Sequence, residues 1–239
     1  MSDSIRFRGD VTVELIKHSA SDADVIWAAR VSTKGEQSHE DLGADAGKSA
    51  GLINYLMRDR HGSPFEHSIF TFFVKAPIFM WREHFRHRIA SYNEESGRYK
   101  VLEPEFYVPA VERKLVQIGK AGHYEFVDGS QEQFDTVTQE TMQACATAYA
   151  AYQSMLDAGV AREVARIVLP LNIYSSAYVT MNARALMNFL SLRRSVEGSH
   201  FPSFPQREIE MVAEQYESIF AELMPLTHAA FEANGRVAP

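Results

Sequence analysis

The sequence predicts a single α+β domain with an antiparallel sheet core flanked by helices and a helical C-terminal half. Two observations favour this fold. β-Branched or aromatic runs at residues 11–16, 67–76 and 174–180 are typical of strands. Runs with the apolar spacing of helices separate these strands and fill most of the chain after residue 132. No shift in composition divides the 239 residues, so we expect one domain over residues 1–239.

Helix signals account for most of the remaining chain. Ser21 precedes a helix over residues 25–31, and a helix over residues 49–60 is broken by His61-Gly-Ser-Pro64. Pro77 opens a helix that we expect to run to about Tyr92. Further helices are predicted over residues 132–157, 161–169, 182–194 and 207–223. Residues 33–47 and 195–206 are predicted loops, and an irregular stretch follows Gly97 to about Gly129.

Composition excludes several classes of protein. Hydrophobic residues make up 46% and charged residues 23%, which is typical of soluble globular chains. The single cysteine, Cys145, excludes an intramolecular disulfide and favours a reducing compartment. The N-terminus lacks an apolar signal core, and the most apolar stretch, residues 70–81, is too short to span a bilayer. We therefore expect a cytoplasmic protein without membrane association.

The charge is unevenly distributed along the chain. The net charge of −7 disfavours general attraction to nucleic acid. All seven cations after Lys120 are arginines. Either the composition drifts in a helical half, or these arginines bind a planar anion, because a guanidinium offers a fixed fork of donors to phosphate or carboxylate.

The most informative run covers residues 81–99. On the predicted helix, Arg82 and Arg86 share one face, while Arg88 lies about 200° from Arg86. One helix could then hold two anions, or two parts of one ligand, on different sides. The alternative interpretation is a solvated face of ion pairs involving Glu83 and Glu94.

Two further clusters have alternative interpretations. The run from His61 to His67 could hold a metal together with His84 and His87, but the adjacent arginines would repel a cation, so no metal site is predicted. Three arginines lie in strongly apolar segments and need an anion or an interhelical salt bridge: Arg166, Arg184 and Arg193. The amides of Asn182 and Asn188 could read a ribose or a heterocycle.

Cys145 lies in an alanine-rich helix. No histidine or cation lies within a helical turn of it, so we expect a buried structural thiol and not a nucleophile.

The run Arg86-His87-Arg88, followed after seven residues by Ser96, resembles the signature of the flavin-dependent thymidylate synthases, the ThyX family. Other segments resemble this family in the same order. They are Ala29-Arg-Val-Ser32, His61-Gly-Ser-Pro-Phe-Glu-His67, Lys75-Ala-Pro-Ile-Phe79, Arg166-Ile-Val-Leu-Pro170, Asn182-Ala-Arg184 and Asn188-Phe-Leu-Ser-Leu-Arg193. The similarity covers about residues 11–225.

The resemblance implies an FAD-dependent homotetramer that converts dUMP to dTMP. The carbon would come from 5,10-methylenetetrahydrofolate, and NADPH would reduce the flavin. FAD would be held by Ser63, Arg86, His87, Arg88, Glu94, Asn182, Arg184 and Asn188. The dUMP site would comprise Glu83, Arg86, Glu94, Ser96, Gly97, Arg98, Arg166 and Arg193. The family's sites take residues from different subunits. Arg193 matches the arginine that favours ionisation at uracil N3.

Three features qualify this resemblance. Ser96 has no dedicated base in the sequence, so we expect it to bind and not to attack. Glu83 stands where many relatives carry glutamine, and we expect it to accept hydrogen bonds from a sugar hydroxyl or an arginine. The link after Arg193 is longer than usual, which leaves open how Arg193 is presented and whether residues 197–205 form a lid or a subunit contact.

Two other functions remain open. One is a catalytically inactive module that binds a nucleotide or a flavin. The other is an arginine-rich protein that binds RNA, which the net charge of −7 and the lack of a basic stripe disfavour.

Overall fold

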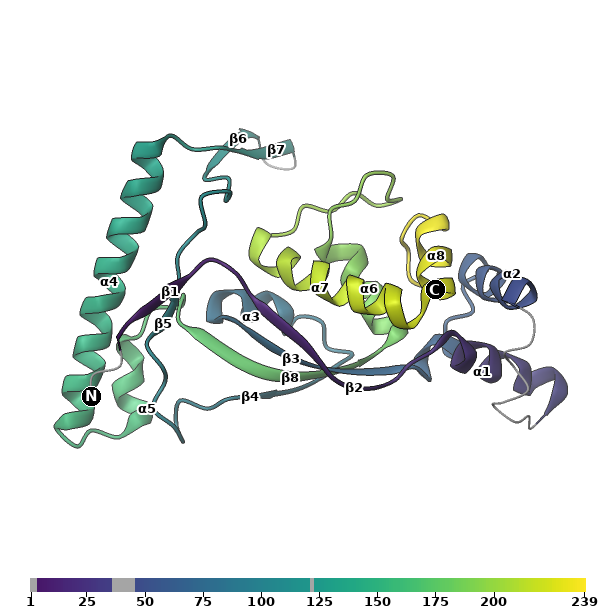
Figure 1. The fold of residues 1–239 in the computed structure, drawn as a ribbon, viewed down its shortest axis with the longest axis horizontal. Coiled ribbons are helices and arrows are strands. Elements are labelled where there is room, and N and C mark those ends of the chain that lie inside the picture. The colour runs from purple at the N-terminus through teal and green to yellow at the C-terminus, as the bar shows by residue number, and fades with distance from the viewer. Residues whose placement is uncertain (1–3, 36–45, 121–122) are drawn as a thin grey trace. The chain divides into compact units, whose positions relative to one another are not determined.

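The computed structural model describes residues 4–35, 46–120 and 123–239 (Figure 1). Residues 36–45, most of the predicted loop over 33–47, lie outside this part of the chain. The described residues form an α+β fold with eight α-helices and a four-stranded sheet of order β2-β3-β8-β4. Among them, no helix is both long enough and apolar enough to cross a bilayer.

The predicted strands β2, β3 and β8 and the predicted helices α1, α2, α4, α6 and α7 are present, together with elements that the sequence did not predict. The strands are β1 (Arg6–Arg8), β2 (Thr12–Ser19), β3 (Ile69–Pro77), β4 (Ser91–Glu94), β5 (Glu105–Tyr107), β6 (Val116–Lys120), β7 (His123–Val127) and β8 (Tyr174–Asn182). The helices are α1 (Asp22–Lys34), α2 (Ala46–Arg58), α3 (Ile78–His84), α4 (Gln131–Asp157), α5 (Arg162–Ala165), α6 (Ala183–Arg193), α7 (Arg207–Leu223) and α8 (Pro225–Ala233). Two 3-10 turns are η2 (Ser63–Glu66) and η3 (Arg166–Val168).

The centre of the four-stranded sheet is antiparallel, as predicted. Thr71 on β3 lies 2.9 Å from Thr180 on β8 through their hydroxyls, and the ring of Phe73 lies 5.8 Å from that of Tyr178. Rising residue numbers on β3 therefore oppose falling numbers on β8. The separate pair of β1 and β5 is parallel, which the sequence did not predict.

Contacts group the chain into two compact units. Unit 1 contains Met1–Val11, Lys75–Arg82 and Glu94–Ser176, and unit 2 contains Thr12–Val74, Glu83–Asn93 and Ala177–Pro239. The boundaries fall directly before β2 and inside β3, α3, β4 and β8. The prediction of one domain over residues 1–239 stays a prediction.

In unit 2, helix α7 packs on strand β3 through aromatic side chains. The ring of Tyr216 lies 4.3 Å from that of Phe72, and Phe220 meets Phe70 edge-on at 6.2 Å. All four side chains are fully buried. Burial of such large rings supplies most of the hydrophobic stabilisation of a small core.

In unit 1, one buried carboxylate holds two neighbouring strands to β3. Glu105 on β5 accepts hydrogen bonds from Arg6 and Arg8 on β1 and from Lys75 on β3, at 2.8 to 3.0 Å. Burial raises the pKa of Glu105, but these cations outweigh it and lower that pKa overall. The charge is therefore compensated, as a buried carboxylate requires.

The predicted helix from Pro77 to about Tyr92 is wrong in its second half. Helix α3 ends at His84, and Ser91–Glu94 forms strand β4. The hydroxyl of Tyr92 lies 3.2 Å from the carbonyl oxygen of His84 and 2.8 Å from that of His87. These carbonyls would otherwise continue the helix, so the tyrosine ends it. Because Arg86 lies beyond the end of α3, the prediction that Arg82 and Arg86 share one face of a helix is also wrong.

Smaller differences concern short elements. The segment 161–169 is not one helix but a single turn, α5, followed by η3. The sequence suggested that Arg166 is held against a core, but Arg166 is exposed. The stretch expected to be irregular, residues 97–129, contains the short strands β5, β6 and β7, and α8 begins at Pro225, a common first residue of a helix.

The substitution Tyr92→Phe should lower the free energy of unfolding by about 1 kcal/mol, because the carbonyl of His87, the nearer acceptor at 2.8 Å, loses its donor. Urea unfolding measures this change. Tyr99→Phe is the matched control, since its side chain is exposed, and should leave the unfolding free energy unchanged. Equal effects of the two substitutions would contradict the capping role of Tyr92.

Candidate functional site

Helix α6 carries four of the predicted site residues. Its N-cap is Asn182, whose Oδ1 accepts the backbone N–H of Ala185 at 2.8 Å. Leu186, Phe189 and Leu190 are buried. This buried stripe sets the rotation of the helix, so that the others, Arg184, Asn188 and Arg193, are half-buried or exposed. The 11 residues of α6 extend about 16 Å.

Arg193 is held at the C-terminal end of α6 by two acceptors. Its Nη1 donates to Oε2 of Glu83 at 2.6 Å, and its Nε donates to Nε2 of His87 at 3.0 Å. The Arg193 side chain is 12% exposed. Burial lowers the pKa of Arg193, Glu83 opposes that shift, and Arg86 adds to it. The prediction that Glu83 accepts from a sugar hydroxyl or an arginine is confirmed for the arginine.

His87 accepts this hydrogen bond because it is neutral. Burial, Arg193 and Arg86 lower the pKa of His87 to about 4. Its proton must then sit on Nδ1, since Nε2 accepts from Arg193. The ring also lies 4.6 Å from that of Phe189 on α6, so it has two supports in unit 2.

A buried histidine lies beneath this turn. His84 is fully buried, and its two ring nitrogens lie 3.3 Å from the hydroxyl of Tyr92 and 3.1 Å from that of Tyr216. Burial and the nearby His87 and Arg193 lower the pKa of His84 to about 3. His84 and His87 were possible metal ligands on sequence grounds. In the structure, His84 is a neutral residue of the core.

Arg86 and Arg88 are exposed on the turn after α3. Within residues 4–35, 46–120 and 123–239, no hydrogen bond or ion pair engages their guanidinium groups. Two neighbouring guanidiniums without a counter-charge repel each other, and a bound anion would relieve that repulsion.

At the other end of α6, a second arginine meets the η2 turn. Arg184 donates from Nη1 to Glu66 at 2.6 Å and from Nε to the carbonyl oxygen of Pro239 at 2.6 Å. A Cβ on Gly62 would lie 2.6 Å from Cζ of Arg184, so glycine is required for this close approach. The exposed Ser63 follows directly, and Asn188 donates to the carbonyl of Arg184 at 3.1 Å.

The remaining predicted residues gather in unit 1. Ser96 Oγ accepts the backbone N–H of Arg98 at 3.3 Å, and Arg98 donates to Glu163 at 2.7 Å. A Cβ on Gly97 would lie 3.2 Å from Cδ of Arg166, which places these two residues side by side. In the same unit, Glu94 accepts from the hydroxyl of Ser175 at 2.6 Å.

The structure thus brings the predicted residues together in two sets. Unit 2 contains Ser63, Glu83, Arg86, His87, Arg88, Asn182, Arg184, Asn188 and Arg193, and unit 1 contains Glu94, Ser96, Gly97, Arg98 and Arg166. Within unit 2, Arg193 and His87 lie at one end of α6 and Arg184 with Ser63 at the other. An extended ligand could follow the helix between these ends.

Sequence reasoning missed several residues that support this site. Tyr92 fixes the turn of Arg86 to Arg88, and Ser175 holds Glu94. Glu66, considered as a metal ligand, instead holds Arg184. No local pattern marks Tyr92 or Ser175, because each acts on a residue that folding brings to it.

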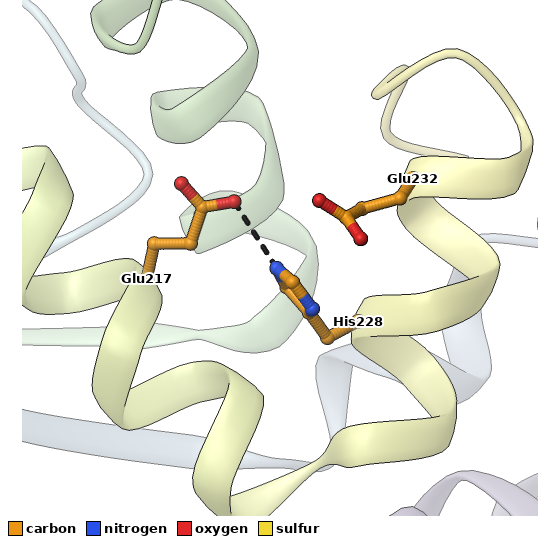
Figure 2. Close-up of side chains that lie close together, drawn as sticks. All are labelled: Glu217, His228 and Glu232. Atoms are coloured by element: carbon orange, nitrogen blue, oxygen red, sulfur yellow. Dashed lines mark hydrogen bonds and ion pairs between the residues drawn. The ribbon is translucent and has the colours of Figure 1, made fainter. Parts of the chain in front are cut away.

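One group of possible metal ligands occurs among the described residues: Glu217, His228 and Glu232 (Figure 2). Glu217 already accepts from Arg194 at 3.0 Å and from Arg236 at 2.6 Å. Two adjacent guanidiniums would repel a divalent cation, so this arrangement is better described as an ion-pair network.

Cys145 is buried, as predicted. Its Sγ lies 3.1 Å from Nδ2 of Asn172, which donates to it. Burial raises the pKa of Cys145, and the hydrogen bond to Asn172 opposes this shift only in part. A thiol with a raised pKa is a poor nucleophile at neutral pH.

Comparison with known proteins decides the family. The sequence profile described as "Thymidylate synthase complementing protein" matches residues 14–226. A flavin-dependent thymidylate synthase of Streptomyces avermitilis is 63% identical over 234 residues, covering 98% of this chain and 95% of that protein. The chain belongs to the flavin-dependent thymidylate synthase family. The family and enzyme class predicted from the sequence are confirmed.

More distant relatives and solved structures agree. The flavin-dependent thymidylate synthase of Thermotoga neapolitana is 45% identical over 219 residues, covering 92% of this chain and 89% of that protein. The crystal structure of a UMP/dUMP methylase, PolB from Streptomyces cacaoi, bound with 5-Br UMP is similar with a TM-score of 0.92 and 52% identity. That comparison covers 99% of this chain and 100% of the other. The PolB structure bound with 5-Br dUMP has a TM-score of 0.92 and 54% identity, covering 98% and 100% of the two chains.

The buried His84 and the half-buried His87 predict how stability depends on pH. Their folded pKa values are about 3 and 4 against an ordinary 6.5, so between pH 6.5 and about pH 4 these two side chains take up protons chiefly in the unfolded state. Stability is therefore fully present above pH 6.5 and falls with decreasing pH, by up to about 1.4 kcal/mol per pH unit for each histidine.

His84→Gln removes one of these groups, and its unfolding free energy should fall about 1 kcal/mol less than that of the wild type between pH 6.5 and 5.5. Urea unfolding at both pH values measures the difference. An identical pH dependence in the two proteins would show that His84 does not contribute.

Proposed function

We propose that this protein converts dUMP to dTMP by reductive methylation. The methylene group comes from 5,10-methylenetetrahydrofolate, and FAD reduced by NADPH supplies the hydride. Membership of the family supports this activity, and so does similarity to solved structures described as a UMP/dUMP methylase. The observation that carries the proposal is the half-buried guanidinium of Arg193, fixed by Glu83 and neutral His87.

The side chains of unit 2 suit a cofactor with phosphate groups. Arg86 and Arg88 are exposed and have no counter-charge among the described residues. Arg184 and Ser63 lie at the far end of α6, with the exposed amide of Asn188 between the ends. FAD would be held by these residues together with His87, Asn182 and Glu94. When bound, FAD supplies the hydride that no side chain can provide.

Arg193 activates the uracil ring. A guanidinium directed at N3 stabilises the negative charge that develops on the pyrimidine as it attacks the carbon donor. Glu83 and His87 fix the orientation of Arg193, so little reorganisation is needed during the reaction. His87 stays neutral at neutral pH and adds no second positive charge beside Arg193.

The residues proposed to bind dUMP are distributed over the sequence of both units. Glu83, Arg86 and Arg193 belong to unit 2, whereas Glu94, Ser96, Gly97, Arg98 and Arg166 belong to unit 1. Arg166 is exposed, and no described residue pairs with its guanidinium, so it is available for the nucleotide phosphate. A homotetramer is part of this proposal, with each site completed by another copy of the single domain.

No protein nucleophile takes part. Cys145 is buried and its pKa is raised, which excludes it from attack on uracil. Ser96 accepts a backbone hydrogen bond from Arg98, and no described base contacts its hydroxyl, so its role is binding. The protein acts in the cytoplasm, where its substrates are small molecules and not nucleic acid.

A second acceptor is UMP, because the similar solved structures are described as a UMP/dUMP methylase and one holds 5-Br UMP. Parallel assays with dUMP and UMP decide between the two nucleotides. A protein that binds flavin and nucleotide but forms no methylated product would instead support the catalytically inactive module.

Arg193→Ala should retain FAD but lower kcat at least about 100-fold, because charge on uracil is no longer stabilised. The assay follows dTMP formation from dUMP, methylenetetrahydrofolate and NADPH. Arg193→Lys keeps the charge without the fork and should be intermediate. Wild-type turnover in Arg193→Ala would remove this residue from the mechanism.

Arg88→Ala should lose FAD on purification, seen as a lower ratio of flavin to protein absorbance, since a phosphate contact disappears. Arg82→Ala is the matched control, because Arg82 is also exposed but lies outside the proposed sites, and should stay yellow. Full flavin occupancy in Arg88→Ala would refute the assignment.

A further inference from the structure

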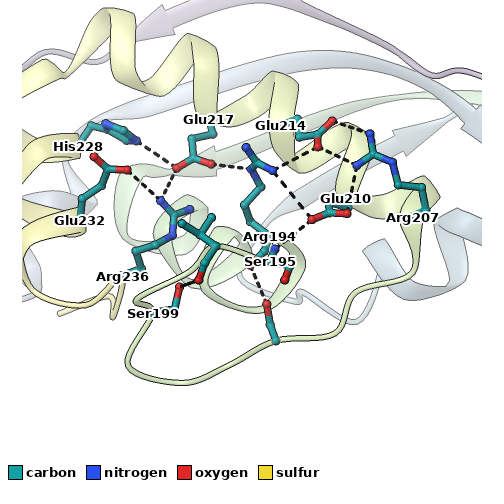
Figure 3. Close-up of polar contacts among 12 residues, drawn as sticks. Arg194, Ser195, Ser199, Arg207, Glu210, Glu214, Glu217, His228, Glu232 and Arg236 are labelled. Atoms are coloured by element: carbon teal, nitrogen blue, oxygen red, sulfur yellow. Dashed lines mark hydrogen bonds and ion pairs between the residues drawn. The ribbon is translucent and has the colours of Figure 1, made fainter. Parts of the chain in front are cut away.

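Two consecutive arginines at the end of α6 point to different partners. Arg193 donates to Glu83 and His87. Figure 3 shows that Arg194 instead reaches Glu217 and Glu214 on α7. Arg194 is the C-cap, with an extended backbone at φ −126° and ψ 123°, and its N–H still bonds to the carbonyl of Leu190 at 3.1 Å. The end of the helix is therefore the point at which the two side chains diverge.

The partners of Arg194 form an acidic row on one face of α7. Glu210, Glu214 and Glu217 are spaced by four and three residues, which aligns their side chains. Arg194 donates to Glu217 at 3.0 Å and to Glu214 at 3.2 Å, and it lies 3.9 Å from Glu210. Arg207 engages the same row from the other side, with two hydrogen bonds to Glu214 of 2.7 and 3.0 Å.

Glu217 is the most enclosed member of the row. Its side chain is 12% exposed, and it also accepts from Arg236 at 2.6 Å and from His228 at 3.1 Å. Burial raises the pKa of Glu217, but His228, Arg236 and Arg194 outweigh it and lower that pKa to about 2. The carboxylate stays charged, so Arg194 always faces a fixed anion.

The long loop after Arg194 is tied to the same network. The N–H of Ser195 donates to Glu210 at 3.1 Å, and the hydroxyl of Ser203 donates to the carbonyl of Arg194 at 2.6 Å. Midway, the N–H of His200 donates to the carbonyl of Gly235 at 2.9 Å. The loop therefore leaves and returns beside Arg194, which restrains the peptide that directly follows Arg193.

We propose that Arg194 is a positioning residue for Arg193. By holding the end of α6 against Glu214 and Glu217, it directs the preceding side chain towards Glu83 and His87. This inference rests on the proposed role of Arg193 in activating uracil. It also explains how Arg193 is presented despite the longer link that follows it. The first two residues of that link, Arg194 and Ser195, bind to glutamates of α7.

Physical magnitudes favour positioning over stability as the function of this contact. Arg194 is 29% exposed, and partly exposed ion pairs add little to the free energy of folding. A shift of about 1 Å in a group that contacts the reacting atoms, however, can lower a rate about 100-fold. Arg207 offers a comparison, since it pairs with the same acidic row but is separated from Arg193 by the whole loop.

The test compares Arg194→Gln with Arg207→Gln in the full-length, FAD-loaded protein. We expect Arg194→Gln to lower kcat for dTMP formation about tenfold with flavin content unchanged. Arg207→Gln should keep turnover within about twofold of the wild type. Arg194→Lys, which keeps the charge but reaches fewer carboxylate oxygens, should recover part of the loss.

The double variant Arg193→Ala/Arg194→Gln shows whether the effect passes through Arg193. If it does, the double variant turns over at the rate of Arg193→Ala alone, because nothing is left to position. A further loss in the double variant, or wild-type turnover in both Arg194 variants, would overturn the proposal. Should Arg194→Gln fail to fold, Arg194→Lys and its double variant carry the same comparison.

The same measurements separate this inference from the proposed function. Wild-type turnover in Arg193→Ala would mean that the proposed mechanism is wrong. Loss of turnover in Arg193→Ala together with wild-type turnover in Arg194→Gln would leave the mechanism intact and remove only the positioning role.

Discussion

The candidate site depends on the cost of placing a guanidinium where water is largely excluded. Arg193 is 12% exposed, so it needs acceptors that stay in place. Glu83 provides the counter-charge, and His87 provides a neutral acceptor because burial and two arginines lower its pKa to about 4. A protonated His87 could not accept from Arg193. The burial of this turn therefore decides whether the arginine is held or repelled.

The early end of helix α3 makes this arrangement possible. The hydroxyl of Tyr92 donates to the carbonyl of His87 and lies 3.2 Å from that of His84, and the chain turns back as β4. His87 then faces Phe189 and Arg193 on α6, while Arg86 and Arg88 are exposed. One turn thus separates an inward acceptor from two outward cations. Within the run Arg86-His87-Arg88, the turn therefore lets the histidine support Arg193 while both arginines face solvent.

Acidic side chains balance the arginines of α6 in different ways. Arg184 is neutralised by Glu66, Arg193 by Glu83, and Arg194 by Glu214 and Glu217. Each pair ties α6 to a different element, namely η2, α3 and α7. The arginines that follow Lys120 are therefore partly structural. Arg86, Arg88 and Arg166 have no such partner among the described residues and suit anionic ligands. The ion pairs are observed for the arginines of α6, whereas anion binding by the others stays a prediction.

The sequence alone determined the strands β2, β3 and β8, the helices α1, α2, α4, α6 and α7, the capping of α1 by Ser21 and the buried state of Cys145, because these depend on local periodicity and composition. It also determined the family, through short motifs in a fixed order. Tertiary structure decided the end of α3, the anchoring of Arg194 and the neutral state of His87. These features depend on contacts with residues elsewhere in the chain. His87, for example, contacts Tyr92, 5 residues away, and Arg193, 106 residues away. A local sequence pattern carries no information on which side chains meet after folding.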